Sequence, residues 1–179
     1  GKDLRPLLRR AAVRPGDCVH VPPGTVHAMG KGLLLAEVQT NSDTTYRLHD
    51  WDRAGPDGRR RPLHVAEALR SLRGDPAAGP RAGREVASAD GVRRTVWVEE
   101  GPYRLQRLDV GAGKRWPLDP GCLCAGVLSG TGRIGPHDYA PGSWWLLGAG
   151  CSARTVVAQE PTAVLLAGVQ IPTPRREHS

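Results

Sequence analysis

The chain has 179 residues, enough for one complete domain and part of a second, and its 23 glycines, 16 prolines and lack of phenylalanine favour many short strands over a helical bundle. Its net charge of +7 comes almost wholly from arginine, and since no aromatic residues are interleaved with the basic clusters, we expect no nucleic-acid partner. We also expect no membrane partner and a cytoplasmic protein, because no apolar run is long enough to span a bilayer and no signal-peptide pattern is present.

The first part of the chain is predicted to contain a short helix and four strands. Asp3 can cap a helix over residues 4–12, where leucines recur at helical spacing, and Pro15-Gly16 ends that segment. Alternating apolar and polar residues then predict strands at about 17–21, 25–29, 33–39 and 45–50.

A loop, a helix and a second β-rich block are predicted for the remainder. Residues 54–62 are charged and rich in turn formers, Leu63–Leu72 has helical spacing, and residues 73–90 resemble a mobile linker. Strands are predicted in the second block at Arg94–Glu99, Tyr103–Val110, Leu123–Leu128, Gly132–Ile134, Ser143–Leu147, Ser152–Val157 and Ala163–Gln170. The four cysteines (Cys18, Cys122, Cys124 and Cys151) form no CxxC pair and are predicted to be buried free thiols.

The sequence contains an internal repeat. Pro15-Gly16-Asp17 and, further on, Gly24 are matched by Pro141-Gly142-Ser143 and Gly150, at a constant offset of 126 residues. The same offset carries His27 to Ala153, so the second copy is predicted to keep the turns and to lack the histidine.

His27 and Arg47 are the candidate functional side chains. A neutral imidazole on a rigid strand is a good metal ligand, and a fixed guanidinium binds an anionic substrate. Together they indicate metal-assisted chemistry on a phosphorylated or carboxylated small molecule.

Gly16, Pro22, Gly24 and His27 meet the second signature of the cupin superfamily, which consists of small antiparallel jelly-roll barrels that hold a metal. The chain further resembles type I mannose-6-phosphate isomerases, in particular their short bacterial form. The likeness rests on Val21–Ala28, Leu35–Gln39, Asn41–Arg47, Asp50–Arg53 and Arg61–His64. It is dense over residues 4–70 and weak but collinear to about residue 172.

The resemblance implies a fold, a cofactor and a reaction. We expect the C-terminal half of a metal-binding barrel over residues 1–57, a helix and linker over 58–90, a complete metal-free barrel over 91–172, and a tail over 173–179. The implied reaction is the zinc-dependent interconversion of mannose 6-phosphate and fructose 6-phosphate, with a phosphorylated hexose as substrate. The family's other zinc ligands and an active-site lysine come from an earlier part of the chain, so we expect an N-terminally truncated form whose residues 1–57 leave sheet edges open and apolar side chains exposed.

Residue by residue, the resemblance makes His27 a zinc ligand, Arg47 the active-site arginine and Glu37 an acidic residue lining the same pocket. Arg47 either binds the phosphate or stabilises an enediolate, and Glu37 is either a general base or a group that orients Arg47 or the metal's ligands. The structural alternatives are a backbone-bonded His27 and a surface ion pair of Arg47 with Asp43 or Asp50.

Other histidines and other functions remain open on the sequence. His20, His49 and His64 are expected to be structural, although His20, His27, Glu37 and His49 could form a self-contained metal site inside a barrel. One alternative function is a non-catalytic cupin module that binds a sugar phosphate or a protein partner. Another is a different cupin chemistry, such as that of a metal dioxygenase or an epimerase.

Overall fold

The computed structural model describes residues 4–73, 79–100, 103–148, 150–152 and 154–169. The chain divides into two compact units, Gly1–Arg81 and Ala82–Ser179. Among the described residues, no helix combines the length and apolar character that crossing a membrane requires. Asp3, Ala153 and the predicted tail lie outside the described residues.

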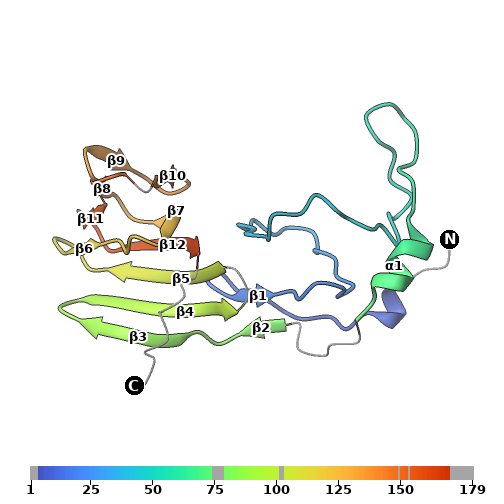
Figure 1. Cartoon of the computed structure of the whole chain (residues 1–179), viewed down its shortest axis with the longest axis horizontal. Helices are drawn as coiled ribbons and strands as arrows, with labels where there is room; N and C mark the ends of the chain where they lie inside the picture. The colour runs from blue at the N-terminus through green and yellow to red at the C-terminus, as the bar shows by residue number, and fades with distance from the viewer. Residues whose placement is uncertain (1–3, 74–78, 101–102, 149, 153, 170–179) are drawn as a thin grey trace, which may run out of the picture. The chain divides into compact units, whose positions relative to one another are not determined.

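The first unit contains little regular structure (Figure 1). Its elements are the 3-10 helix η1 (Arg5–Leu7), strand β1 (Cys18–His20), helix α1 (Val65–Ser71) and strand β2 (Gly79–Arg81). β1 and β2 pair antiparallel, with Cys18 opposite Arg81. Helix α1 confirms the predicted helix over Leu63–Leu72, and the loop over 54–62 is confirmed as an exposed turn with one bridge between Ala54 and Arg60.

Several predicted elements of the first unit are wrong. The helix over 4–12 stops after Leu7, which is exposed, because no packed apolar face stabilises further turns. Residues 25–29, 33–39 and 45–50, all within the described chain, form no strand. Alternation alone does not make a strand, which also needs a neighbour to accept and donate its backbone hydrogen bonds.

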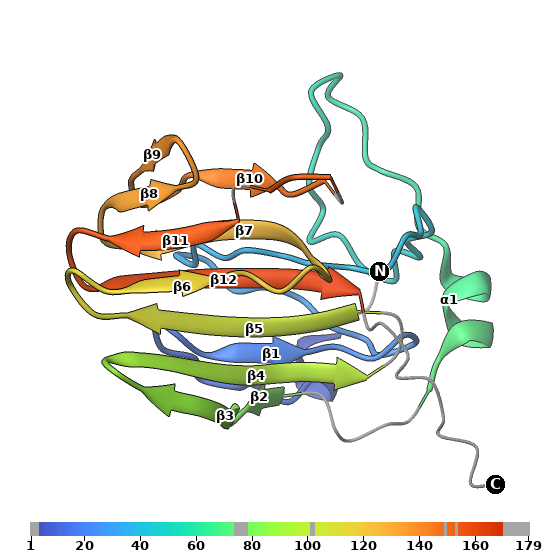
Figure 2. The ribbon, with the colours of Figure 1, turned by 60° about the vertical axis from the view of Figure 1, so that its left-hand side comes forward.

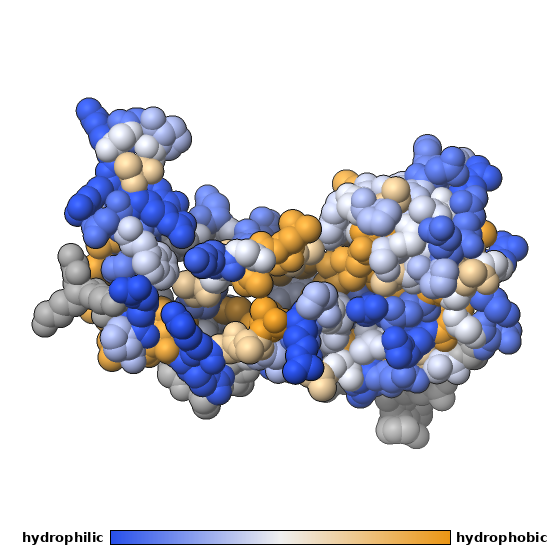
Figure 3. Space-filling view, turned by 180° about the vertical axis from the view of Figure 1, so that it is seen from behind, coloured by the Kyte–Doolittle hydropathy of each residue, from blue (hydrophilic) through white to orange (hydrophobic). Residues whose placement is uncertain are grey.

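Apolar side chains of the first unit face solvent, as predicted for residues 1–57. Leu34 is fully exposed, and the exposed set also contains Leu7, Val13, Val19, Val26, Met29, Leu33, Leu35, Tyr46 and Trp51. Apolar residues accordingly reach the molecular surface between charged ones in Figure 3.

The second unit is a sandwich of two antiparallel sheets (Figure 2). The six-stranded sheet has the order β10-β7-β12-β5-β4-β3, and the four-stranded sheet has the order β6-β11-β8-β9. Their bounds are β3 (Arg84–Ala89), β4 (Val92–Glu100), β5 (Tyr103–Val110), β6 (Arg115–Pro117), β7 (Cys122–Ser129), β8 (Gly132–Ile134), β9 (His137–Tyr139), β10 (Trp144–Leu146), β11 (Thr155–Ala158) and β12 (Thr162–Val169). From β5 to β12 the chain crosses repeatedly between the two sheets, which is the topology of a jelly roll.

One apolar core joins the two sheets of this unit. Leu108 of β5 and Val164 of β12 pack with Val156 of β11, and all three are 0% exposed. Each such side chain contributes about 1.5–3 kcal/mol by its burial. The strands predicted for this block are therefore confirmed, apart from shifts of up to three residues at their ends. The prediction missed β3, β6 and β9, and β2 and β3 lie where a linker was predicted.

The repeat is visible in the structure as two copies of one turn and strand. The backbone N–H of Asp17 donates to the carbonyl of Arg14 (3.0 Å), and the N–H of Ser143 donates to that of Ala140 (3.0 Å). Each turn is closed a second time by a side chain, since Arg14 N–H donates to Asp17 Oδ2 (2.7 Å) and Ala140 N–H to Ser143 Oγ (3.1 Å). β1 and β10 follow these turns at the same offset of 126 residues.

Candidate functional site

The segment before His27 is held in place by a turn that requires glycine. Thr25 N–H donates to the carbonyl of Pro22 (3.2 Å), and Gly24 has a φ of +83°. A Cβ at Gly24 would lie 2.5 Å from the carbonyl oxygen of Ser71 at the end of α1, and Arg73 N–H donates to the carbonyl of Gly24 (3.0 Å). Since a larger residue would break this contact, glycine fixes the turn against the end of the helix.

The ring of His27 is exposed, and a backbone carbonyl selects the tautomer of its neutral form. Nδ1 lies 3.0 Å from the carbonyl oxygen of Thr25. A carbonyl oxygen only accepts, so Nδ1 must carry the proton, and in the neutral ring Nε2 keeps a free lone pair. Metal-binding histidines are oriented in this way, with the second ring nitrogen donating to a carbonyl or a carboxylate. His27 is bonded to the backbone, as the structural alternative anticipated, yet this bond leaves Nε2 available as a ligand.

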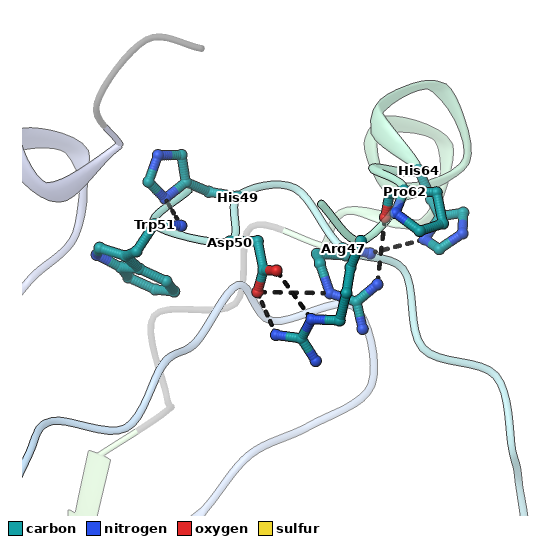
Figure 4. Close-up of polar contacts among 7 residues, drawn as sticks. Arg47, His49, Asp50, Trp51, Pro62 and His64 are labelled. Carbon is teal, nitrogen blue, oxygen red and sulfur yellow. Dashed lines mark hydrogen bonds and ion pairs between the residues drawn. The ribbon is translucent and has the colours of Figure 1, made fainter. Parts of the chain in front are cut away.

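Arg47 is braced against the segment that leads into α1 (Figure 4). Its backbone N–H donates to His64 Nδ1 (3.2 Å), and its carbonyl accepts from His64 N–H (2.8 Å). Its guanidinium Nη1 also donates to the carbonyl of Pro62 (3.2 Å). These bonds hold a half-buried arginine to residues 62–64 at both its main chain and its side chain.

Asp50 lies beside Arg47 but is bonded to Arg61. The Arg61 Nε donates to Asp50 Oδ2 (2.8 Å) and its Nη2 to Oδ1, so the carboxylate is held by both oxygens. Arg47 Nε is 3.8 Å from the same Oδ1, at the limit of an ion pair. The hydrogen bond from Arg61 lowers the pKa of Asp50, and the charges of Arg61, Arg47 and Arg53 lower it further against the opposing effect of burial. Asp50 is thus shared unequally, with Arg61 bonded to both of its oxygens and Arg47 at ion-pair distance from one.

A strained turn follows Asp50. Trp51 and Asp52 have φ angles of +51° and +52°, and Arg53 N–H donates to the carbonyl of Asp50 (3.0 Å). Residues with a side chain rarely adopt this conformation, and such strain is concentrated at functional sites. The Trp51 ring packs edge-on against His49 at 5.0 Å, with the Arg53 guanidinium 5.6 Å from its centre.

The predicted site residues are brought together only in part. Glu37 is exposed on irregular chain, not turned inward on a strand as predicted. Within the described ranges, no hydrogen bond or ion pair links His27 or Glu37 to Arg47. The predicted alternative of an Arg47–Asp50 ion pair is present, whereas the alternative with Asp43 is not seen among the described contacts.

The described residues hold no group of three histidine, cysteine, aspartate or glutamate side chains that could bind a metal. The self-contained site of His20, His27, Glu37 and His49 is therefore wrong. His49 shows one reason, since its Nδ1 accepts from Trp51 N–H (3.3 Å) and its Nε2 must carry the proton. His27 fits a zinc ion as one ligand of a larger set.

The sequence suggested Asp50 as a partner of Arg47, but it did not reveal the contacts of Arg47 with Pro62 and His64 or the pairing of Asp50 with Arg61. The segment Arg61–His64 was noted only for its likeness, and its hydrogen bonds reach back 11 residues from Arg61 to Asp50 and 17 residues from His64 to Arg47. A repeated arginine–aspartate pattern in a loop is the one signal that could have indicated them.

The four cysteines are free thiols, as predicted, but the prediction that all four are buried is wrong for two of them. Cys18 and Cys122 are buried, whereas Cys124 and Cys151 are partly exposed. Burial raises the pKa of Cys122 to about 11, partly offset by the charge of Arg154. A thiol of this kind is a poor nucleophile and a poor metal ligand.

Comparison with known proteins gives a consistent result. No family model matches the chain. It is 37% identical over 135 residues to a protein of Bacillus subtilis named probable mannose-6-phosphate isomerase GmuF, and 36% identical over 137 residues to the mannose-6-phosphate isomerase of Streptococcus mutans. These matches cover 74% and 75% of this chain but 42% of each relative, so the chain spans less than half the length of the curated relatives it matches.

A solved structure is similar as well. The crystal structure of the mannose 6-phosphate isomerase from Bacillus subtilis superposes with a TM-score of 0.58 and 21% identity, covering 71% of this chain and 41% of that one. At this identity the likeness concerns the fold, and it confirms the predicted mainly β cupin class.

Proposed function

We propose that this protein takes part in the interconversion of mannose 6-phosphate and fructose 6-phosphate. The reason is that about three quarters of the chain is homologous to mannose-6-phosphate isomerases. The observation that carries the metal-dependent part of this proposal is the hydrogen bond from His27 Nδ1 to the Thr25 carbonyl. It presents Nε2 unprotonated, directly after the turn that Gly24 fixes. The proposed cofactor is Zn²⁺, and the proposed substrate is a phosphorylated hexose.

In this proposal His27 Nε2 is one zinc ligand, and the ligand set is completed by residues outside this chain. Bound zinc supplies a Lewis acid that stabilises negative charge developing on the sugar oxygens. Arg47 binds an anionic oxygen of the substrate, for which its brace to residues 62–64 fixes the guanidinium in advance. The reaction moves one proton from C2 to C1 and another between the oxygens O2 and O1; Glu37 is the acidic candidate for the base, although this chain holds it exposed on an irregular segment.

The cytoplasm is the proposed compartment. The four cysteines are free thiols, and phosphorylated hexoses are intermediates of central carbohydrate metabolism.

A non-catalytic cupin module that binds a sugar phosphate is the second candidate. The observation in its favour is that the described residues contain no three-ligand metal group. The two candidates differ in turnover, which only the first requires.

The test measures interconversion of the two hexose phosphates by the chain alone and by the chain supplied with the part of the Bacillus subtilis GmuF protein that it does not span. The isomerase proposal predicts turnover in the supplied form that EDTA abolishes and Zn²⁺ restores. Arg47→Ala should lower kcat by about 10²–10³-fold, as the loss of a fixed group that stabilises negative charge does. The matched control is Arg59→Ala in the exposed loop, which should leave kcat unchanged.

Two results would contradict the proposal. Full activity after removal of metal by EDTA excludes a zinc-dependent reaction. A large loss of zinc in Arg47→Ala makes this arginine a structural support of the metal site. Binding of hexose phosphate with no turnover in either form selects the second candidate.

A further inference from the structure

Strand β10 lies at the edge of the six-stranded sheet, where it has a neighbour on one side only (Figure 2). We propose that this edge is a dimerisation surface, at which β10 pairs antiparallel with β10 of a second copy of the chain around a two-fold axis at Trp145. The inference rests on the backbone and side chains of the second unit, and it does not depend on the proposed function.

The backbone of β10 can accept a second strand. The Ser143 carbonyl accepts a hydrogen bond from β7 at 2.9 Å, and Leu147 N–H donates to a carbonyl of β7 at 2.7 Å. Hydrogen bonding alternates along an antiparallel strand, so Trp145 also faces β7, while Trp144 and Leu146 direct their N–H and C=O groups away from it. In the part of the chain that the structure describes, no strand pairs with this second side of β10.

The side chains of the same two residues are apolar and exposed. Trp144 is 49% exposed and Leu146 is 88% exposed, whereas Trp145 between them packs against the core of the sandwich. When two copies of β10 pair around Trp145, Trp144 lies opposite the partner's Leu146, and the reverse pair forms on the other side of the axis. Each of these pairs exchanges both of its backbone hydrogen bonds and brings an indole and a leucine side chain into contact.

Charge distinguishes β10 from the other edge strands of the second unit. Charged side chains on an edge strand keep strands of other molecules from pairing with it. The other edge strands are β3, β6 and β9, and each has charged or titratable side chains: Arg84 and Glu85 in β3, Arg115 in β6, and His137 and Asp138 in β9. By contrast, residues 139–153, which include β10, contain no Asp, Glu, Lys, Arg or His.

This lack of charge favours a second copy as the occupant of the edge. Around a two-fold axis each residue meets the same segment of the other copy, so a charge close to the axis would meet its like and be repelled. An uncharged apolar strand avoids that repulsion, whereas an acidic or basic partner would find no complementary charge on it. Because β10 has only three residues, the surface is small and we expect a weak dimer.

Sedimentation equilibrium of the full chain, over about 10–500 µM, tests the proposal. We expect the mean mass to rise with concentration from 19.2 kDa toward twice that value. Leu146→Asp places a charge beside the axis, and Leu146→Pro removes the N–H on the unpaired side while leaving the bonds to β7 in place. Each should weaken self-association by at least about tenfold.

The matched control is Leu34→Asp, which makes the same change at the fully exposed leucine of the first unit and should self-associate as wild type does. Exchange of single amide protons, followed by NMR, reports the strand pairing itself. The amides of Trp144 and Leu146 should exchange fast in dilute protein and become protected at high concentration. Those of Trp145 and Leu147, which face β7, should be protected at every concentration.

Three results would overturn the proposal. The first is a chain that stays monomeric over the whole concentration range. The second is self-association that Leu34→Asp abolishes and Leu146→Asp leaves unchanged, because the first unit would then join the copies. The third is a dimer in which the exchange of the Trp144 and Leu146 amides does not slow with concentration, since the copies would then meet without pairing their β10 strands.

Discussion

Leu34 and Leu108 allow one substitution to be compared at the two extremes of exposure. Leu34 is fully exposed in the first unit, whereas Leu108 of β5 is 0% exposed in the core of the second. Leu34 lies in the segment 33–39, which the sequence predicts as a strand with one buried face. Replacing each leucine by alanine therefore asks whether the apolar surface of residues 1–57 is packed against anything in this chain.

The expected magnitudes differ widely. Removing a buried leucine side chain costs about 2–5 kcal/mol, because the loss of burial adds to the cavity left behind. Leu108 sits among Val110, Val156 and Val164, so Leu108→Ala should fall in that range. Leu34→Ala removes a side chain already in water, and its effect should stay within about 0.5 kcal/mol.

Hydrogen exchange followed by mass spectrometry measures both effects, because it reports the opening free energy of each peptide separately. Leu108→Ala should lower the protection of β5 and β12, while Leu34→Ala should leave that of β1 and α1 unchanged. A loss of 2 kcal/mol or more on Leu34→Ala would show that residues 33–39 are packed in this chain, and would refute the exposed arrangement. When the part of the Bacillus subtilis GmuF protein that this chain does not span is supplied, Leu34→Ala should lower the opening free energy measurably.

Two further predictions follow from pKa shifts. Burial raises the pKa of Cys122 to about 11 from 9.0, so at pH 8 the folded protein should hold about 100-fold less thiolate at this position than the unfolded chain. Labelling of Cys122 by iodoacetamide, followed by mass spectrometry, checks this. Equal labelling rates with and without urea would contradict it. Arg61 lowers the pKa of Asp50 below 3.8, so the stabilising contribution of Asp50 is present above that value and is lost as pH falls through the lower folded value. Wild type should thus lose stability to urea between pH 5 and 2 more steeply than Asp50→Asn, and parallel curves would show that the pair with Arg61 does not form.

The second unit was largely predictable because its long strands carry their own apolar pattern and have their partners within the chain. Tyr103–Val110 is confirmed with the predicted bounds, since Gln106, Leu108 and Val110 alternate onto the buried face. The edge strand β3 was missed because its residues Arg84–Ala89 show little apolar alternation, and it forms by pairing with β4. Pairing rather than composition made it a strand.

The first unit shows the opposite failure. Residues 33–39 alternate as a strand should, but the described chain provides no neighbour for their backbone groups. At the candidate site, the cupin signature was enough to select His27, and the likeness to isomerases was enough to select Arg47. The proton positions of His27 and His64 depend on contacts with backbone carbonyl and N–H groups, which no sequence pattern encodes.

The duplicated turn has a consequence for how such a binding site changes over time. The Asp17 carboxylate in one copy and the Ser143 hydroxyl in the other accept the equivalent backbone hydrogen bond, and a strand follows each turn. The turn therefore tolerates exchange of the side chain that accepts this hydrogen bond. It is also retained in the second copy, whose sequence has alanine at the position equivalent to His27. The turn and the strand after it are therefore compatible with either histidine or alanine at this place, and exchanging the two requires no change in the framework.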